Sequence, residues 1–184
     1  MFRRHKMNNE IKNHLPESKT GRMALCASMI ALSMIFGYVE SLIPIAVPIP
    51  GIKPGIANIV TVVCFYLFGK RMAWTVALVR IILMGLLFGN GYSFAFSMAG
   101  GCLSLICMTL GMKAKVFSET GVSVIGGVSH NVGQIVAAAI LMNAALVLAE
   151  IPLLVVGGVI CGLLIGLLSA LIIRKMKAVN IGNI

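Results

Sequence analysis

The chain has 184 residues, of which 59% are hydrophobic and only 11% are charged, and its mean hydropathy is +1.03. A soluble domain has about a quarter charged residues, and a domain this short leaves a large share of its surface exposed. This composition excludes a soluble fold and predicts one domain whose apolar surface faces lipid. The net charge of +10 comes from short basic clusters between apolar runs, with almost no aromatic residues among them. That pattern favours lipid headgroups as neighbours and argues against a nucleic-acid partner.

The N-terminal stretch, residues 1–21, is polar and basic and has no apolar core of its own. It is predicted to be a cytoplasmic leader to the first helix and not a cleavable signal peptide. The transmembrane domain is expected over residues 22–175, followed by a cytoplasmic tail at 176–184.

Six apolar segments predict an all-α, polytopic membrane protein with six transmembrane helices. A spanning helix needs about 20 mostly apolar residues, and the second segment is shorter than this. Residues 44–55, which precede it, are rich in proline and cannot form a regular helix, because each proline removes a hydrogen-bond donor. Such backbone must lie at the interface or be covered by protein, so we expect a loop that folds over the bundle. The segments are 23–43, 56–68, 72–88, 92–112, 122–142 and 151–173.

The distribution of lysine and arginine predicts the orientation. With the N-terminus inside, 13 of the 15 basic residues fall in cytoplasmic segments, and the outer loops hold only Lys53. The remaining one, Arg80, is inside a helix. The positive-inside rule therefore places both termini in the cytoplasm of a multi-pass protein of the cell membrane.

Ionisable and amide side chains at membrane depth are costly and point to function. With the orientation above, they all fall in the middle or outer half of the membrane, which predicts a polar, outward-facing pocket under the Pro-rich loop. His130 and Gln134 are four residues apart and share a helix face. The predicted substrate-binding residues are Glu40, Asn58, Arg80, His130, Asn131 and Gln134.

Two interpretations of these residues stay open. In the first, Arg80 supplies charge for an anionic group of a small molecule, and the His-Asn-x-x-Gln cluster supplies directional hydrogen bonds. In the second, Arg80 pairs with Glu40 and the polar side chains hold the helices together. An unpaired guanidinium near the midplane costs several kcal/mol, and three adjacent hydrogen-bonding side chains exceed what helix association requires, so the first is favoured.

Motifs for self-contained catalysis are missing from the sequence. The chain has no aspartate, so it cannot carry an Asp-rich motif for Mg²⁺ and diphosphate, and it has no P-loop for ATP. Its three histidines lack metal-ligand spacing, and its five cysteines form no CxxC pair. We expect no catalytic residues, no metal and no cofactor; a scaffold in a membrane redox assembly is not favoured by the scattered cysteines.

Four stretches carry a resemblance to a known family: YVESLIP at 38–44, PIPGIKPGIANIV at 48–60, LLFG at 86–89 and SHNVGQ at 129–134. They resemble the "Gx transporter" family, commonly labelled heptaprenyl diphosphate synthase component I, over nearly all of residues 22–175. The family is grouped with the substrate-binding S-components of energy-coupling factor (ECF) transporters.

This resemblance implies a six-helix, S-component-like bundle that captures a small molecule from the outer face. It also implies that Ala27 and Ala31, in the first helix, dock an ECF transmembrane subunit driven by separate ATPases. The alternative that the label implies is a non-catalytic membrane component that supports a prenyl diphosphate synthase catalytic subunit in isoprenoid-quinone synthesis. The sequence does not identify the substrate.

Overall fold

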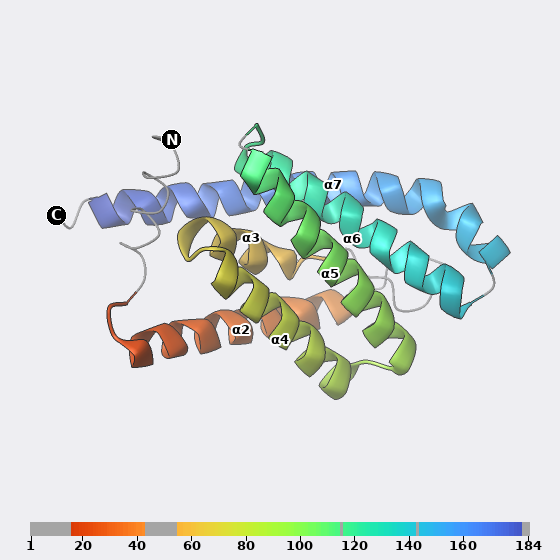
Figure 1. Cartoon of the computed structure of the whole chain (residues 1–184), viewed down its shortest axis with the longest axis horizontal. Coiled ribbons are helices and arrows are strands. Elements are labelled where there is room, and N and C mark those ends of the chain that lie inside the picture. The colour runs from red at the N-terminus through yellow and green to blue at the C-terminus, as the bar shows by residue number, and fades with distance from the viewer. Residues whose placement is uncertain (1–15, 43–54, 115, 143, 182–184) are drawn as a thin grey trace.

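The chain forms an all-α bundle in the computed structural model, which describes residues 16–42, 55–114, 116–142 and 144–181. These residues form helices and contain no strand (Figure 1). The predicted fold class is therefore confirmed. The helices are α2 (Lys19–Leu42), α3 (Asn58–Leu67), α4 (Lys70–Phe88), α5 (Gly91–Ala114), α6 (Glu119–Leu141) and α7 (Ala144–Ile181).

Five of these helices are long and apolar enough to cross a membrane. In each of the five, less than half of the most apolar stretch is buried in the protein, so the rest is available to lipid. The sixth, α3, has 10 residues and is about 15 Å long, roughly half the hydrocarbon core. Helix α7 is longer than its predicted segment, because it starts before Pro152 and continues to Ile181.

Helix α3 lies inside the bundle, and nearly all of its residues are buried. Helices α2, α4, α5, α6 and α7 follow one another as neighbours around it, in that order. Helix α3 itself contacts α2, α4, α6 and α7, and its apolar side chains, such as Phe65 and Leu67, form the main core. Because α3 is short, it fills the middle of the bundle over only part of its length.

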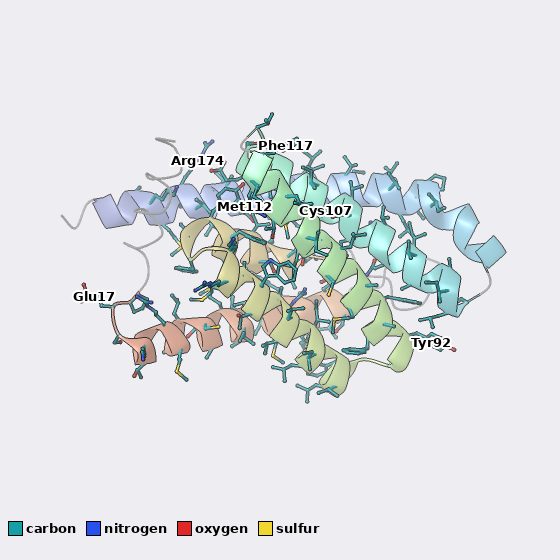
Figure 2. The ribbon with its side chains drawn as sticks, in the orientation of Figure 1. Glu17, Tyr92, Cys107, Met112, Phe117 and Arg174 are labelled. Carbon is teal, nitrogen blue, oxygen red and sulfur yellow. The ribbon has the colours of Figure 1, made fainter. Side chains whose placement is uncertain are left out.

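The bundle has two chemically different ends. The Tyr38 and Phe88 rings lie 5.2 Å apart, so α2 and α4 finish side by side at what we call the Phe88 end. The opposite, Lys70 end holds the starts of α2 and α4 and the last part of α7; Glu17 and Arg174 lie toward it and Tyr92 toward the Phe88 end (Figure 2). Apart from Arg80, every basic residue in the described part of the chain belongs to the Lys70 end: Lys19, Arg22, Lys70, Arg71, Lys113, Arg174, Lys175 and Lys177.

Glycines bring α5, α6 and α7 into backbone contact. A Cβ added at Gly133 of α6 would lie 2.7 Å from the carbonyl oxygen of Ala99 in α5. A Cβ added at Gly162 of α7 would lie 2.8 Å from the Cα of Val124 in α6. Small residues at such contacts are the usual basis of helix association in lipid, where apolar burial gives little driving force. Helices α5 to α7 are therefore one closely packed group.

This packing predicts different effects for two glycine substitutions in α7. Gly162→Ala should destabilise the protein by about 1–3 kcal/mol, because the backbone of α6 must move to admit the methyl group. Gly157→Ala is the matched control, since a Cβ there meets nothing within 4 Å. Thermal unfolding of the purified proteins in detergent measures the difference. Equal melting temperatures for the two variants would contradict this account of the interface.

Candidate functional site

A cavity of about 40 Å³ lies in the part of the bundle that α3 does not fill. Its wall comes from α2, α4, α5, α6 and the residue that precedes the turn into α3. Helix α2 has no backbone contact with α5 or α6, so the space between them is left to side chains. The polar side chains and the turn residue that line it are Glu40, Gly55, Arg80, Ser93, Ser97 and His130.

The guanidinium of Arg80 is the central charged group of this cavity. Arg80 is only 8% exposed and lies eight residues before the end of α4, close to the middle of the helix. Its Nη2 donates to Oδ1 of Asn58 over 3.4 Å, while its Nε has no partner among the residues that the structure describes. Asn58 is the first residue of α3, so the start of the half-length helix is attached to the charged side chain. A buried guanidinium with a free N–H is ready to bind an acceptor.

The carboxylate of Glu40 holds the turn that leads into α3. Glu40 is 4% exposed and accepts a hydrogen bond from the N–H of Gly55. Gly55 has a φ of +87°, and a Cβ there would lie 2.8 Å from Nδ2 of Asn58, so this position requires glycine. Glu40 and Arg80 line the same cavity, but these two described residues do not form a direct ion pair with each other. The predicted alternative of a Glu40–Arg80 pair is thus present only as a longer-range interaction of the two charges.

His130 reaches the cavity from α6. It is 5% exposed, its Nδ1 has no hydrogen-bond partner among the described residues, and its ring lies close to Gly100 of α5. A Cβ at Gly100 would lie 2.7 Å from the carbonyl oxygen of His130, so the two helices touch at this point. The ring is therefore held by α5 while one nitrogen stays available to a ligand.

The other two residues of the His-Asn-x-x-Gln cluster lie away from the cavity wall. Asn131 donates through Nδ2 to the carbonyl oxygen of Leu154 over 2.6 Å and so joins α6 to α7. Gln134 is fully buried next to Gly100, and within the described ranges both of its amide atoms lack a partner. Asn131 fits the helix-association interpretation, whereas Gln134 extends the polar region one turn beyond His130.

Two serines of the cavity were not among the predicted site residues. Ser93 and Ser97 are one turn apart on α5 and both face the cavity. Asn90 fixes the start of this helix, because its Oδ1 accepts from the N–H of Ser93 over 2.8 Å. The four-residue spacing of two serines is a signal in the sequence, but the same spacing is common in simple helix packing.

The remaining predicted positions lie elsewhere. Ala27 and Ala31 are exposed on α2, which contacts only α3 and α4 among the described elements. Of the Pro-rich loop expected above the pocket, only Gly55 is among the described residues, and 43–54 lie outside them. In the ranges that the structure describes, no three His, Cys, Asp or Glu side chains come together as ligands of a metal would.

A family model described as heptaprenyl diphosphate synthase component I matches residues 29–172. The chain belongs to this family. The match starts in α2 and ends in α7, so it includes every polar residue of the cavity. The resemblance drawn from the four sequence stretches is confirmed as far as this component I family is concerned. Among curated proteins and solved structures, none matches the chain.

The hydrogen bond of Asn131 gives a test of its role in packing α6 against α7. Asn131→Ala removes the hydrogen bond to Leu154 and should lower the free energy of unfolding by about 0.5–1.5 kcal/mol, the range for such bonds between membrane helices. Thermal unfolding in detergent checks the loss. Val132→Ala, at a neighbouring lipid-facing position, is the control and should change stability less. A stable Asn131→Ala protein would show that this hydrogen bond does not hold α6 to α7.

Proposed function

We propose that this member of the component I family is a non-catalytic membrane subunit that binds a small polar molecule in the cavity between α2, α4, α5 and α6. The proposal rests on one observation: Arg80 and His130 are nine-tenths buried, line the same cavity, and each carry a nitrogen without a partner in the described part of the chain. A buried polar nitrogen without a hydrogen bond is costly, and a bound ligand would supply the missing acceptors. Glu40, Asn58 and the two serines complete the site, and Gln134 supports it from the next turn of α6.

Binding can be tested directly on the purified protein. Native mass spectrometry of the wild type should show a co-purifying small molecule. Arg80→Gln and His130→Ala should lower its occupancy, with affinity reduced about tenfold or more, because each loses a buried hydrogen-bonding group worth about 1.4 kcal/mol or more. Arg71→Gln is the matched control, since Arg71 is exposed at the Lys70 end. If both cavity variants keep the ligand as the control does, the proposed site is wrong.

The family description favours a role beside a heptaprenyl diphosphate synthase catalytic subunit. We infer that this chain is the membrane component of such a pair, with the cavity holding a molecule that regulates or enters isoprenoid-diphosphate metabolism. The chain lacks aspartate and hence the Asp-rich motif that binds Mg²⁺ and diphosphate, so the chemistry would belong to the partner. Co-expression with the catalytic subunit tests this role: we expect co-purification and a change in product length or rate, and neither effect would contradict it.

A second candidate is uptake, in which the chain acts as an ECF S-component-like subunit. It is favoured by the exposed face of α2, where Ala27 and Ala31 leave room for a partner helix. Ala31→Trp should then abolish uptake while leaving ligand binding intact. A variant that still transports, or that loses binding, would exclude docking at this face. The two roles are distinguished by which partner co-purifies, a prenyl synthase or an ECF transmembrane subunit.

We further propose that the Lys70 end faces the cytoplasm, with the leader at 1–21 and the tail at 176–184 on that side of the cell membrane. The support is the gathering of the described basic residues at one end of the bundle. A reporter fused at the C-terminus should behave as cytoplasmic, giving fluorescence with green fluorescent protein and no activity with alkaline phosphatase. A fusion after Asn90 should give the opposite pair of results. Reversed results would mean that the Lys70 end faces away from the cytoplasm.

A further inference from the structure

The cavity contains both a carboxylate and a guanidinium that do not neutralise each other through direct contact. Glu40 and Arg80 are 4% and 8% exposed and belong to neighbouring helices, α2 and α4. Each is held by a neutral partner: Glu40 by the N–H of Gly55, and Arg80 by the amide oxygen of Asn58. The two side chains are thus fixed in place as separate charges.

Both groups keep unused hydrogen-bonding capacity. A carboxylate has about four acceptor positions and a guanidinium five donors, and among the described residues each side chain uses one of these, on its neutral partner. The Nε of Arg80 is also buried without a partner. The cavity therefore offers a negatively charged hydrogen-bond acceptor on the α2 side and positively charged hydrogen-bond donors on the α4 side.

Charge balance limits which ligands suit such a site. At membrane depth a charge without a counter-charge is expensive, because the surroundings have a low dielectric constant. Glu40 and Arg80 together sum to zero, so a simple anion would satisfy Arg80 and leave an excess negative charge beside Glu40. A simple cation would do the reverse. A ligand that carries both charges pairs with each group and keeps the site neutral.

The start of α3 does not turn this cavity into an anion site. Its first two N–H groups are already used, since Asn58 donates to the carbonyl of Gly55 over 2.8 Å and Ile59 to that of Ile56 over 3.0 Å. The opposite wall carries the hydroxyls of Ser93 and Ser97 and the free Nδ1 of His130, which bind neutral or charged polar groups alike. The selection by charge thus rests with Glu40 and Arg80.

The size of the cavity restricts the ligand further. The cavity is small, about 40 Å³, so it suits the compact polar end of a ligand and not a hydrocarbon chain. We infer that the site takes a small zwitterion, with its acidic group on Arg80 and its primary ammonium on Glu40. This inference rests on the proposed function, because it names the ligand class of the same cavity. An ammonium and an acidic group occur together in free amino acids and in the ethanolamine phospholipid headgroup.

The test compares molecules of similar size that differ in charge. Calorimetric titration of the wild type in dodecyl maltoside would use glycine, β-alanine and 4-aminobutyrate as zwitterions, and propionate and propylamine as the matched anion and cation. Glycerophosphoethanolamine, compared with glycerophosphate, represents the lipid headgroup. At least one zwitterion should bind about tenfold more tightly than the compounds lacking one of its charges. Preference for β-alanine or for glycerophosphoethanolamine tells the two sources apart.

Two variants, one isosteric and one charge-preserving, show which residue binds which charged group of the ligand. Glu40→Gln keeps an oxygen that can accept from Gly55, and it should reduce zwitterion binding to the level of the anion. Arg80→Lys keeps the positive charge, so the preference for a zwitterion should persist with weaker binding. Both variants are first checked for folding by thermal unfolding and gel filtration.

Propionate or glycerophosphate binding as tightly as the zwitterions would overturn the inference, as would an unchanged preference in Glu40→Gln. Absence of binding by every zwitterion would overturn it too. If a co-purified molecule without an ammonium group is lost in Arg80→Gln, the zwitterion inference fails while the proposed binding function stands. If no molecule binds in any assay, both fail together.

Discussion

The length of α3 is the constraint on which the rest of the structure depends. A helix of 10 residues can be covered on all sides by longer helices, but it cannot fill the axis of a bundle that spans about 30 Å of hydrocarbon. The side chains at its start must therefore meet a space that no apolar core occupies. Arg80 lies at this level and donates to Asn58, so the position of the charge and the beginning of the helix are fixed together. The polar cavity is the direct result.

The strongest features of the sequence predicted the fold well. Long apolar runs interrupted by short basic turns have few solutions other than membrane helices, and the five long helices agree with the predicted segments within a few residues, apart from the extended ends of α7. The orientation rests on charge distribution alone and stays a prediction. The second segment was the ambiguous one, since its 13 residues fit either a short span or a buried half-span. Which of the two forms depends on the lengths of the neighbouring helices, and the local sequence of the segment does not give those lengths.

The site was predicted less completely, because neighbouring residues of a helix point in different directions around its axis. His130 and Asn131 are adjacent in the sequence, but successive residues of a helix point about 100° apart. One therefore reaches the cavity beside α5 and the other reaches the backbone of α7. The shared face of His130 and Gln134 follows from their spacing, and both lie against Gly100. Ser93 and Ser97 line the cavity because of the way α5 packs against α4. The spacing of residues along α5 does not give this packing, so the two serines could not be predicted from periodicity.

The glycine contacts of α5, α6 and α7 have a consequence for how ligand and protein stability are linked. They make these three helices one closely packed group, which meets α2, α3 and α4 mainly where α4 contacts α5 and where α3 contacts α7. The cavity lies on this boundary, with Glu40 and Arg80 on one side and Ser93, Ser97 and His130 on the other. A ligand held by both sides would contact α2 and α4 as well as α5 and α6. Binding of such a ligand to the folded state would then raise the free energy of unfolding of the whole bundle and not of one helix alone.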